Sequence, residues 1–172
     1  MYWCRYLIRH RHRFCRKTSV DGDEIWISIL GEVYNVTDGA KHYAKGKSYG
    51  NFAGRDASVP FVTGRFTADE ADKSPMVLNS TDLPGLAEWR DFYRTHAVYK
   101  FVGKLIDPRY YDATGEPTDE MMKLQEQIQT ARAEQALRLK KKKEERLKKQ
   151  KEKEMEEASK PKAKAKSKFS GK

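Results

Sequence analysis

The chain has 172 residues, with 35 Lys and Arg against 25 Asp and Glu, and a formal net charge of +10. This length accommodates one ordinary domain with extensions, and a charged fraction of 35% beside a hydrophobic fraction of 38% is too polar for a uniformly folded globule. No apolar run approaches the roughly 20 residues of a membrane-spanning helix, and two cysteines exclude a disulfide scaffold.

The positive charge is concentrated at the two ends of the chain. Residues 1–20 contain six Lys and Arg and no acid, and residues 138–172 contain sixteen Lys and Arg and six acids. Residues 21–137 carry a net charge of −6. An acidic body with two basic extensions is therefore expected, and the pI of the whole chain says nothing about the partners of the body.

Residues 1–20 form a predicted basic arm. An Arg-rich segment without acids is typical of a mitochondrial presequence or a peripheral membrane helix, and it equally suits an arm lying on RNA or on an acidic protein. A solvated arm without a partner is a further alternative. Zinc binding by four residues of the arm is also open, although their spacing matches no standard finger: Cys4, His10, His12 and Cys15.

A hairpin is predicted at the start of the acidic body. Ile25, Ile27 and Ile29 alternate with other residues, which indicates a strand with a buried face. The pair Gly31-Glu32 interrupts the run and residues 33–36 resume it. We expect the turn at this pair, with the Glu32 side chain exposed.

Residues 39–54 read as a Gly-rich loop with aromatic residues between the four glycines. Glycine allows the backbone to approach a ligand closely, so the loop suits a binding site. An ordinary connection whose aromatic side chains cover the core is the alternative.

The following elements, in chain order, are a cap and turn at 56–58, an apolar turn at 60–62, a helix at 83–93 capped by Asp82, and a short strand at 99–102 ended by Gly103. Together they predict a small α+β domain over residues 21–117.

Several ordered motifs in this domain resemble the cytochrome b5-like haem/steroid-binding domain, within it the membrane-associated progesterone receptor family, and most closely the neuferricin branch. The resemblance covers about residues 23–125 and rests on these runs: Gly31-Glu-Val-Tyr-Asn-Val-Thr-Asp-Gly-Ala-Lys-His-Tyr43, Tyr49-Gly-Asn-Phe-Ala-Gly-Arg-Asp-Ala-Ser58, Phe61-Val-Thr-Gly64, Trp89-x-x-Phe-Tyr93, Val102-Gly-Lys-Leu105 and Tyr110-Tyr-Asp-x-x-Gly-x-Pro-Thr118.

The resemblance implies a particular haem chemistry. Cytochrome b5 itself holds haem between two histidines, but here Tyr43 stands where the first would fall and residues 63–65 supply no second. In the progesterone-receptor-like family a tyrosine phenolate is the single axial ligand, and Tyr49 occupies that position. Phenolate is a hard anionic donor that favours ferric iron. The expected metal ligand is therefore Tyr49, with haem as the cofactor.

The same resemblance assigns the remaining pocket residues. Tyr43 and Tyr99 match two further pocket tyrosines of the family. Lys41, Lys45 and Lys47 lie in the loop and could meet the haem propionates. Val98 departs from the family because some relatives have a lysine there.

A second departure concerns the beginning of the domain. The family normally has a strand and a helix before the strand at Ile25, with an acidic, Leu-bearing pattern that residues 1–17 do not show. The domain is therefore expected to lack its usual first strand and helix. A strand from another chain, a truncated domain or a different gene start would each account for this.

A long projecting helix is predicted over residues 118–159, which contain no Gly or Pro and are rich in good helix formers. Thr118 is the expected N-cap, and Met121, Leu124 and Ile128 share one face that could dock on the domain. Residues 160–172 form a Lys-rich tail expected to be disordered on its own. Through Arg5–Lys17 and Lys140–Lys172 the chain is expected to attach to an anionic surface, either RNA or acidic protein.

No nucleophile–base pair or catalytic carboxylate pair is indicated by spacing, so we do not expect an enzyme. The sequence favours a cytochrome b5-like binding or scaffold module, possessing a tyrosinate haem site and tethered by its basic extensions to a larger assembly. The alternative is a structural subunit of a large complex with a vestigial, haem-free pocket. The sequence does not decide between a mitochondrial and a cytoplasmic or cytoskeletal assembly.

Overall fold

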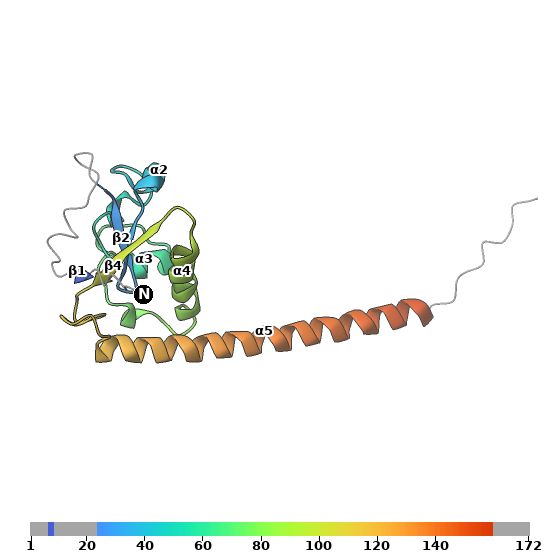
Figure 1. The fold of residues 1–172 in the computed structure, drawn as a ribbon. Helices are drawn as coiled ribbons and strands as arrows, with labels where there is room; N and C mark the ends of the chain where they lie inside the picture. Colours follow the sequence, from blue (N-terminus) through green and yellow to red (C-terminus); the bar gives the residue numbers. More distant parts are fainter. Residues whose placement is uncertain (1–6, 9–23, 160–172) are drawn as a thin grey trace, which may run out of the picture. The chain divides into compact units, whose positions relative to one another are not determined.

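The computed structural model describes residues 7–8 and 24–159. A four-stranded sheet has the order β1-β4-β3-β2 (Figure 1). β2 and β3 form an antiparallel hairpin, β4 pairs antiparallel with β3, and β1 pairs parallel with β4. The strand bounds are Leu7–Ile8 for β1, Trp26–Ile29 for β2, Glu32–Asn35 for β3 and Lys100–Leu105 for β4.

The hairpin turn lies one residue earlier than predicted. Ile29 pairs with Glu32, so Leu30 and Gly31 form a two-residue turn in which both have positive φ, 50° and 71°. A Cβ at Gly31 would lie 2.6 Å from the Cβ of Tyr110, which makes glycine necessary there. The prediction that Glu32 is exposed in the turn is wrong: it belongs to β3, and only 6% of it is exposed.

β4 does not end at Gly103, as the sequence analysis expected, but continues to Leu105. Gly103 pairs with Val33, next to a shift of register between Val33 and Tyr34. Glycine in a strand often marks such a bulge, because the bulge changes the local twist and spacing of the pair.

The N-terminal segment contributes a strand to the sheet. β1 pairs Leu7 with Lys104 and Ile8 with Leu105. The edge of the sheet next to β4 is therefore occupied by a strand. The sequence analysis had expected the domain to lack its usual first strand. The four residues considered as zinc ligands, and the rest of the basic arm, lie outside the described residues.

Short helices connect the hairpin to β4. Their bounds are Thr37–Gly39 (η1), Ala40–Tyr43 (α2), Gly50–Phe52 (η2), Ser58–Thr63 (α3), Pro75–Val77 (η3) and Leu83–Thr95 (α4). α3 packs against α4, and α4 packs against β4. Asp82 stands at the N-cap of α4 as predicted, but its side chain makes no capping hydrogen bond.

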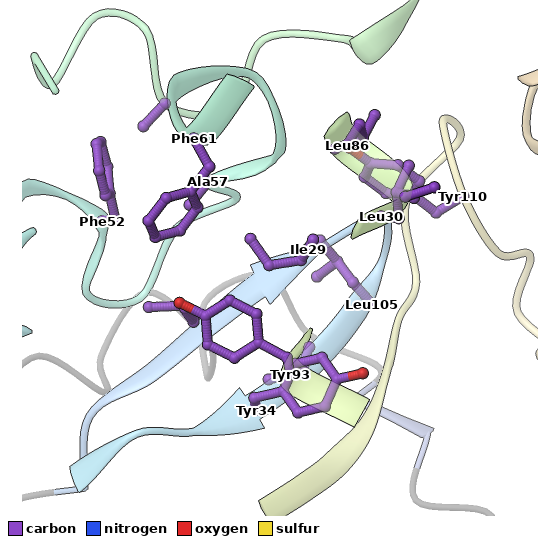
Figure 2. Packing of buried hydrophobic residues seen from close by; sticks show 14 of the residues in the cluster. Ile29, Leu30, Tyr34, Phe52, Ala57, Phe61, Leu86, Tyr93, Leu105 and Tyr110 are labelled. Carbon is purple, nitrogen blue, oxygen red and sulfur yellow. The ribbon is translucent and has the colours of Figure 1, made fainter. Parts of the chain in front are cut away.

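The core lies between the sheet and these helices (Figure 2). Ile29, Phe52 and Leu86 are fully buried and come from β2, η2 and α4 respectively. At about 25 cal/mol per Å² of buried apolar surface, such side chains supply most of the stabilisation of a domain of this size.

α5 spans Asp119–Ser159, close to the predicted bounds. The hydroxyl of Thr118 accepts a hydrogen bond of 3.2 Å from the Met121 amide, which confirms the predicted N-cap. Met121, Leu124 and Ile128 are buried, as the apolar spacing predicted. The chain divides into two compact units, 1–133 and 134–172, so α5 contributes to both. Within the described ranges no helix is long and apolar enough to cross a membrane.

Candidate ligand site at three tyrosines

The structure brings together the three tyrosines that the sequence analysis singled out. Tyr43 ends α2, Tyr49 precedes η2, and Tyr99 precedes β4. The ring of Tyr43 lies 5.5 Å from that of Tyr49 and 5.9 Å from that of Tyr99. Gly39 permits this approach, because a Cβ there would lie 2.6 Å from the Tyr99 hydroxyl.

Tyr43 is the buried member of the group, with 3% of its surface exposed. Its hydroxyl lies 2.5 Å from the hydroxyl of Tyr93, which is itself fully buried on α4. Burial raises the pKa of both phenols well above the usual value, because the anion would lose its hydration. Tyr43 and Tyr93 therefore remain protonated and hold each other in place.

Tyr49 differs from Tyr43 in what its hydroxyl contacts. The ring is half-buried and is held by neighbouring rings, with centroid distances of 5.2 Å to Phe61, 5.1 Å to Phe66 and 6.3 Å to Phe52. Among the residues that the structure describes, no hydrogen-bond partner of the Tyr49 hydroxyl is found. The aromatic packing therefore holds the ring of Tyr49, whereas the Tyr43 side chain is also held through its hydroxyl.

Tyr99 forms the other side of the group and is positioned by His96. The two rings stack at 3.9 Å with an interplanar angle of 12°. The Nδ1 atom of His96 accepts from the backbone amides of Val98 and Tyr99, both at 3.3 Å. In the neutral imidazole the proton is then on Nε2. Val98, at the position where some relatives have lysine, is 43% exposed and apolar.

The predicted cationic residues lie at the surface. Lys41 and Lys47 are exposed, and neither forms an ion pair with any residue in the described ranges. His42 is also exposed, and its ring centroid lies 6.3 Å from that of Tyr49. Over residues 24–159 no group of three or more His, Cys, Asp or Glu side chains could hold a metal ion.

Two contributors to the site were missed by the sequence analysis. Tyr93 is the hydroxyl partner of Tyr43, although the two residues are 50 positions apart. Phe66 contacts the Tyr49 ring and is 38% exposed. The helical spacing of 83–93 could have identified Tyr93 as an inward-facing residue, but nothing local to Phe66 indicated its place.

The Gly-Arg-Asp-Ala-Ser run follows η2 in the chain and forms buried polar contacts of its own. The carboxylate of Asp56 is fully buried, accepts hydrogen bonds from the Tyr110 hydroxyl and, at 2.6 Å, from the Ser58 hydroxyl, and lies 3.5 Å from Arg109. Burial raises its pKa to about 6 despite these partners. Arg55 donates at 3.0 Å to Asp72. These contacts anchor the chain directly after η2.

Comparison with known proteins agrees with the motifs. The chain is 48% identical over 123 residues to a neuferricin homolog of Drosophila pseudoobscura pseudoobscura, covering 66% of this chain and 41% of the relative. It is 47% identical over 94 residues to membrane-associated progesterone-binding protein 4 of Arabidopsis thaliana, covering 55% and 37%. It thus spans about two fifths of the length of these relatives.

A solved Arabidopsis thaliana protein described as having a cytochrome b5 like fold is 26% identical, with a TM-score of 0.49 and coverage of 56% of this chain and 88% of that one. A family model of the cytochrome b5-like heme/steroid binding domain matches residues 12–123. The match covers well over half of the sequence, and the chain belongs to this family.

Proposed function

We propose that the domain binds ferric haem with the Tyr49 phenolate as the single axial ligand. The observation that carries this proposal is the contrast between two neighbouring phenols: the Tyr43 hydroxyl is engaged by Tyr93, whereas the Tyr49 hydroxyl has no partner among the described residues. Ferric iron is a hard ion that prefers an anionic oxygen donor. Coordination would supply the charge stabilisation that the phenolate needs.

The aromatic side chains around Tyr49 have the chemistry that suits a planar, largely apolar macrocycle. Phe61 and Phe66 set the Tyr49 ring in an aromatic wall, and Tyr99 stands beyond Tyr43. The exposed ammonium groups of Lys41 and Lys47 are the candidate partners of the two propionates. Bound haem would supply a Lewis-acidic ferric centre, and the protein's part is to bind and orient it.

In this proposal Tyr43 is a positioning residue. Its raised pKa keeps it a phenol, so it does not compete for iron as an anion. Tyr93 fixes the orientation of its hydroxyl. We assign the domain a binding role without catalysis, because the tyrosine group contains no nucleophile paired with a general base.

A haemin titration of the full-length chain tests the proposal. The wild-type protein should take up one haemin per chain and give a ferric phenolate charge-transfer spectrum. Tyr49→Phe removes only the donor oxygen and should abolish that spectrum. Tyr43→Phe is the matched control, which removes a neighbouring hydroxyl and should leave a phenolate spectrum of altered position. An unchanged spectrum in Tyr49→Phe would contradict the assignment.

The second candidate is a haem-free structural subunit. It is favoured by the packing of Phe66 against Tyr49 at 5.1 Å and against Phe52 at 5.9 Å, which could represent a pocket closed by side chains. No haemin uptake by the correctly folded wild-type protein would select this candidate. In both cases we propose that the basic extensions, Arg5–Lys17 and Lys140–Lys172, tether the domain to an anionic partner.

A further inference from the structure

The distal part of α5 carries a row of cations along one side. Five basic residues follow one another at steps of four, four, three and four positions, which confines them to an arc of about 80° at 100° per residue. All five are exposed, and none forms an ion pair with another described residue. This basic row consists of Arg138, Lys142, Arg146, Lys149 and Lys153.

The acids of this segment lie outside the basic row, on one side of it. From 138 to 153 no acid falls within the 80° arc of the row, but Glu145 and Glu152 lie about 20° and 40° beyond its Arg138 edge. All three acids of this stretch lie on that side, together with four lysines. Those residues are Glu144, Glu145, Glu152, Lys140, Lys141, Lys148 and Lys151.

Helix stability accounts for the row only in part. Each consecutive pair in it, such as Lys142 and Arg146, places like charges three or four residues apart, and such pairs destabilise a helix by about 0.2–0.5 kcal/mol each. Glu145 precedes Lys149 by four residues and offsets part of this repulsion, but no acid stands three or four positions from Arg146. An anion bound along the row would neutralise the remaining repulsion.

The residues in and around the basic row distinguish between an acidic protein, a membrane and a nucleic acid as the anionic partner. Protein interfaces are depleted of lysine and rely on aromatic or apolar anchors, but the whole segment 138–153 offers only Leu139 and Leu147. Two leucines are also too few for the apolar face of a helix lying in a membrane surface. No aromatic residue is present between 134 and 159, which disfavours stacking on single-stranded bases.

We propose that the basic row binds the phosphate backbone of double-stranded nucleic acid without reading its sequence. The row is about 22 Å long at 1.5 Å per residue, and duplex DNA presents one negative charge per roughly 1.7 Å of its axis. Lys and Arg on a straight helix therefore meet phosphates along the whole row. Backbone contacts of this kind position a protein on a duplex and carry no base specificity.

Two full-length variants with equal charge test the proposal. The row variant replaces Lys142, Arg146, Lys149 and Lys153 with Gln, and the control variant replaces Lys140, Lys141, Lys148 and Lys151 with Gln. Each loses four of the positive charges that make up the net +10. Gln has a helix propensity close to that of Lys, and circular dichroism should confirm equal helix content.

Binding is measured by fluorescence anisotropy with a labelled 20-base-pair DNA of mixed sequence at several salt concentrations. The row variant should bind at least about tenfold more weakly at physiological salt, and its slope of log K against log salt should fall by about 3 to 4. The control should retain most of the affinity and slope.

Equal loss in both variants would overturn the proposal, because only net charge would then matter. Wild-type binding to polyglutamate or to phosphatidylserine vesicles that is tighter than to DNA, with the same dependence on the row, would overturn it in favour of an acidic protein or a membrane.

Discussion

The folded body and the distal part of α5 use charge in opposite ways. In the body, Glu32 is buried and is held by Arg94 and by the Tyr34 hydroxyl at 2.6 Å. In α5 beyond residue 134, every described side chain is exposed. Packing fixes the position of each polar group in the body, whereas helical periodicity alone arranges the charges of the distal helix. Function in the first region therefore depends on single residues, and in the second on their spacing.

A pair of leucine substitutions gives the largest expected contrast. Leu86→Ala removes a fully buried side chain and should lower the free energy of unfolding by about 3 kcal/mol, through lost apolar burial and a cavity. Leu147→Ala removes a side chain that is 54% exposed, and it should change the free energy of unfolding by less than about 0.5 kcal/mol. Urea denaturation followed by tryptophan fluorescence measures both. Equal effects would remove the distinction between the regions.

A pair of glutamate substitutions sharpens the electrostatic contrast. Glu32→Ala leaves the buried Tyr34 hydroxyl without its acceptor. The free energy of unfolding should fall by about 2 kcal/mol, because an unsatisfied buried donor keeps its desolvation penalty. Glu152→Ala on the exposed helix should cost much less, within about 0.5 kcal/mol. The same denaturation assay applies, and a stable Glu32→Ala protein would show that the buried pair is dispensable.

The buried carboxyl of Asp56 predicts a pH dependence of the stability of the body. Its pKa in the folded protein, about 6, lies above the ordinary value of about 3.9. The folded state therefore binds the proton more tightly, and the contribution of Asp56 to stability is full below about pH 4 and is lost as the pH rises through 6.

Asp56→Asn should remove this dependence. The difference in unfolding free energy between the wild type and the variant should change by on the order of 1 to 2 kcal/mol between pH 4 and 7, in favour of the wild type at the lower pH. A difference that is independent of pH would show that Asp56 is charged throughout. Denaturation at a series of pH values provides the measurement.

The smallest expected effect is that of removing residues 134–172. Because these residues form a separate unit, a chain that ends at Ala133 should keep the stability of the body within about 0.5 kcal/mol. It retains Ile128 and Ala131, which are buried. A larger loss, measured by denaturation of both chains, would mean that the distal helix supports the body.

Local patterns predicted the elements that depend on local chemistry. The cap at Thr118 and the apolar face of α5 follow from residue type and 3.6-residue spacing. The motif at Tyr43 and Tyr49 located the candidate site, and the structure places these rings 5.5 Å apart.

Contacts between distant residues were not predictable in this way. The turn at Leu30 requires a positive φ that leucine rarely adopts, so the sequence favoured a turn at the next residue. The burial of Glu32 depends on Arg94, which lies 62 positions away. Tyr93 likewise meets Tyr43 only through the packing of α4. The last two are tertiary contacts that no local pattern encodes.

Resonance Raman spectroscopy of the full-length chain with ferric haemin tests the identity of the proposed ligand most directly. Excitation in the phenolate-to-iron charge-transfer band enhances ring modes of the coordinated tyrosine. We predict these modes in the wild type and in Tyr99→Phe, and their complete loss in Tyr49→Phe. Phenolate modes that persist in Tyr49→Phe, or that disappear in Tyr99→Phe while Tyr49 is intact, would contradict the assignment of Tyr49 as the axial ligand.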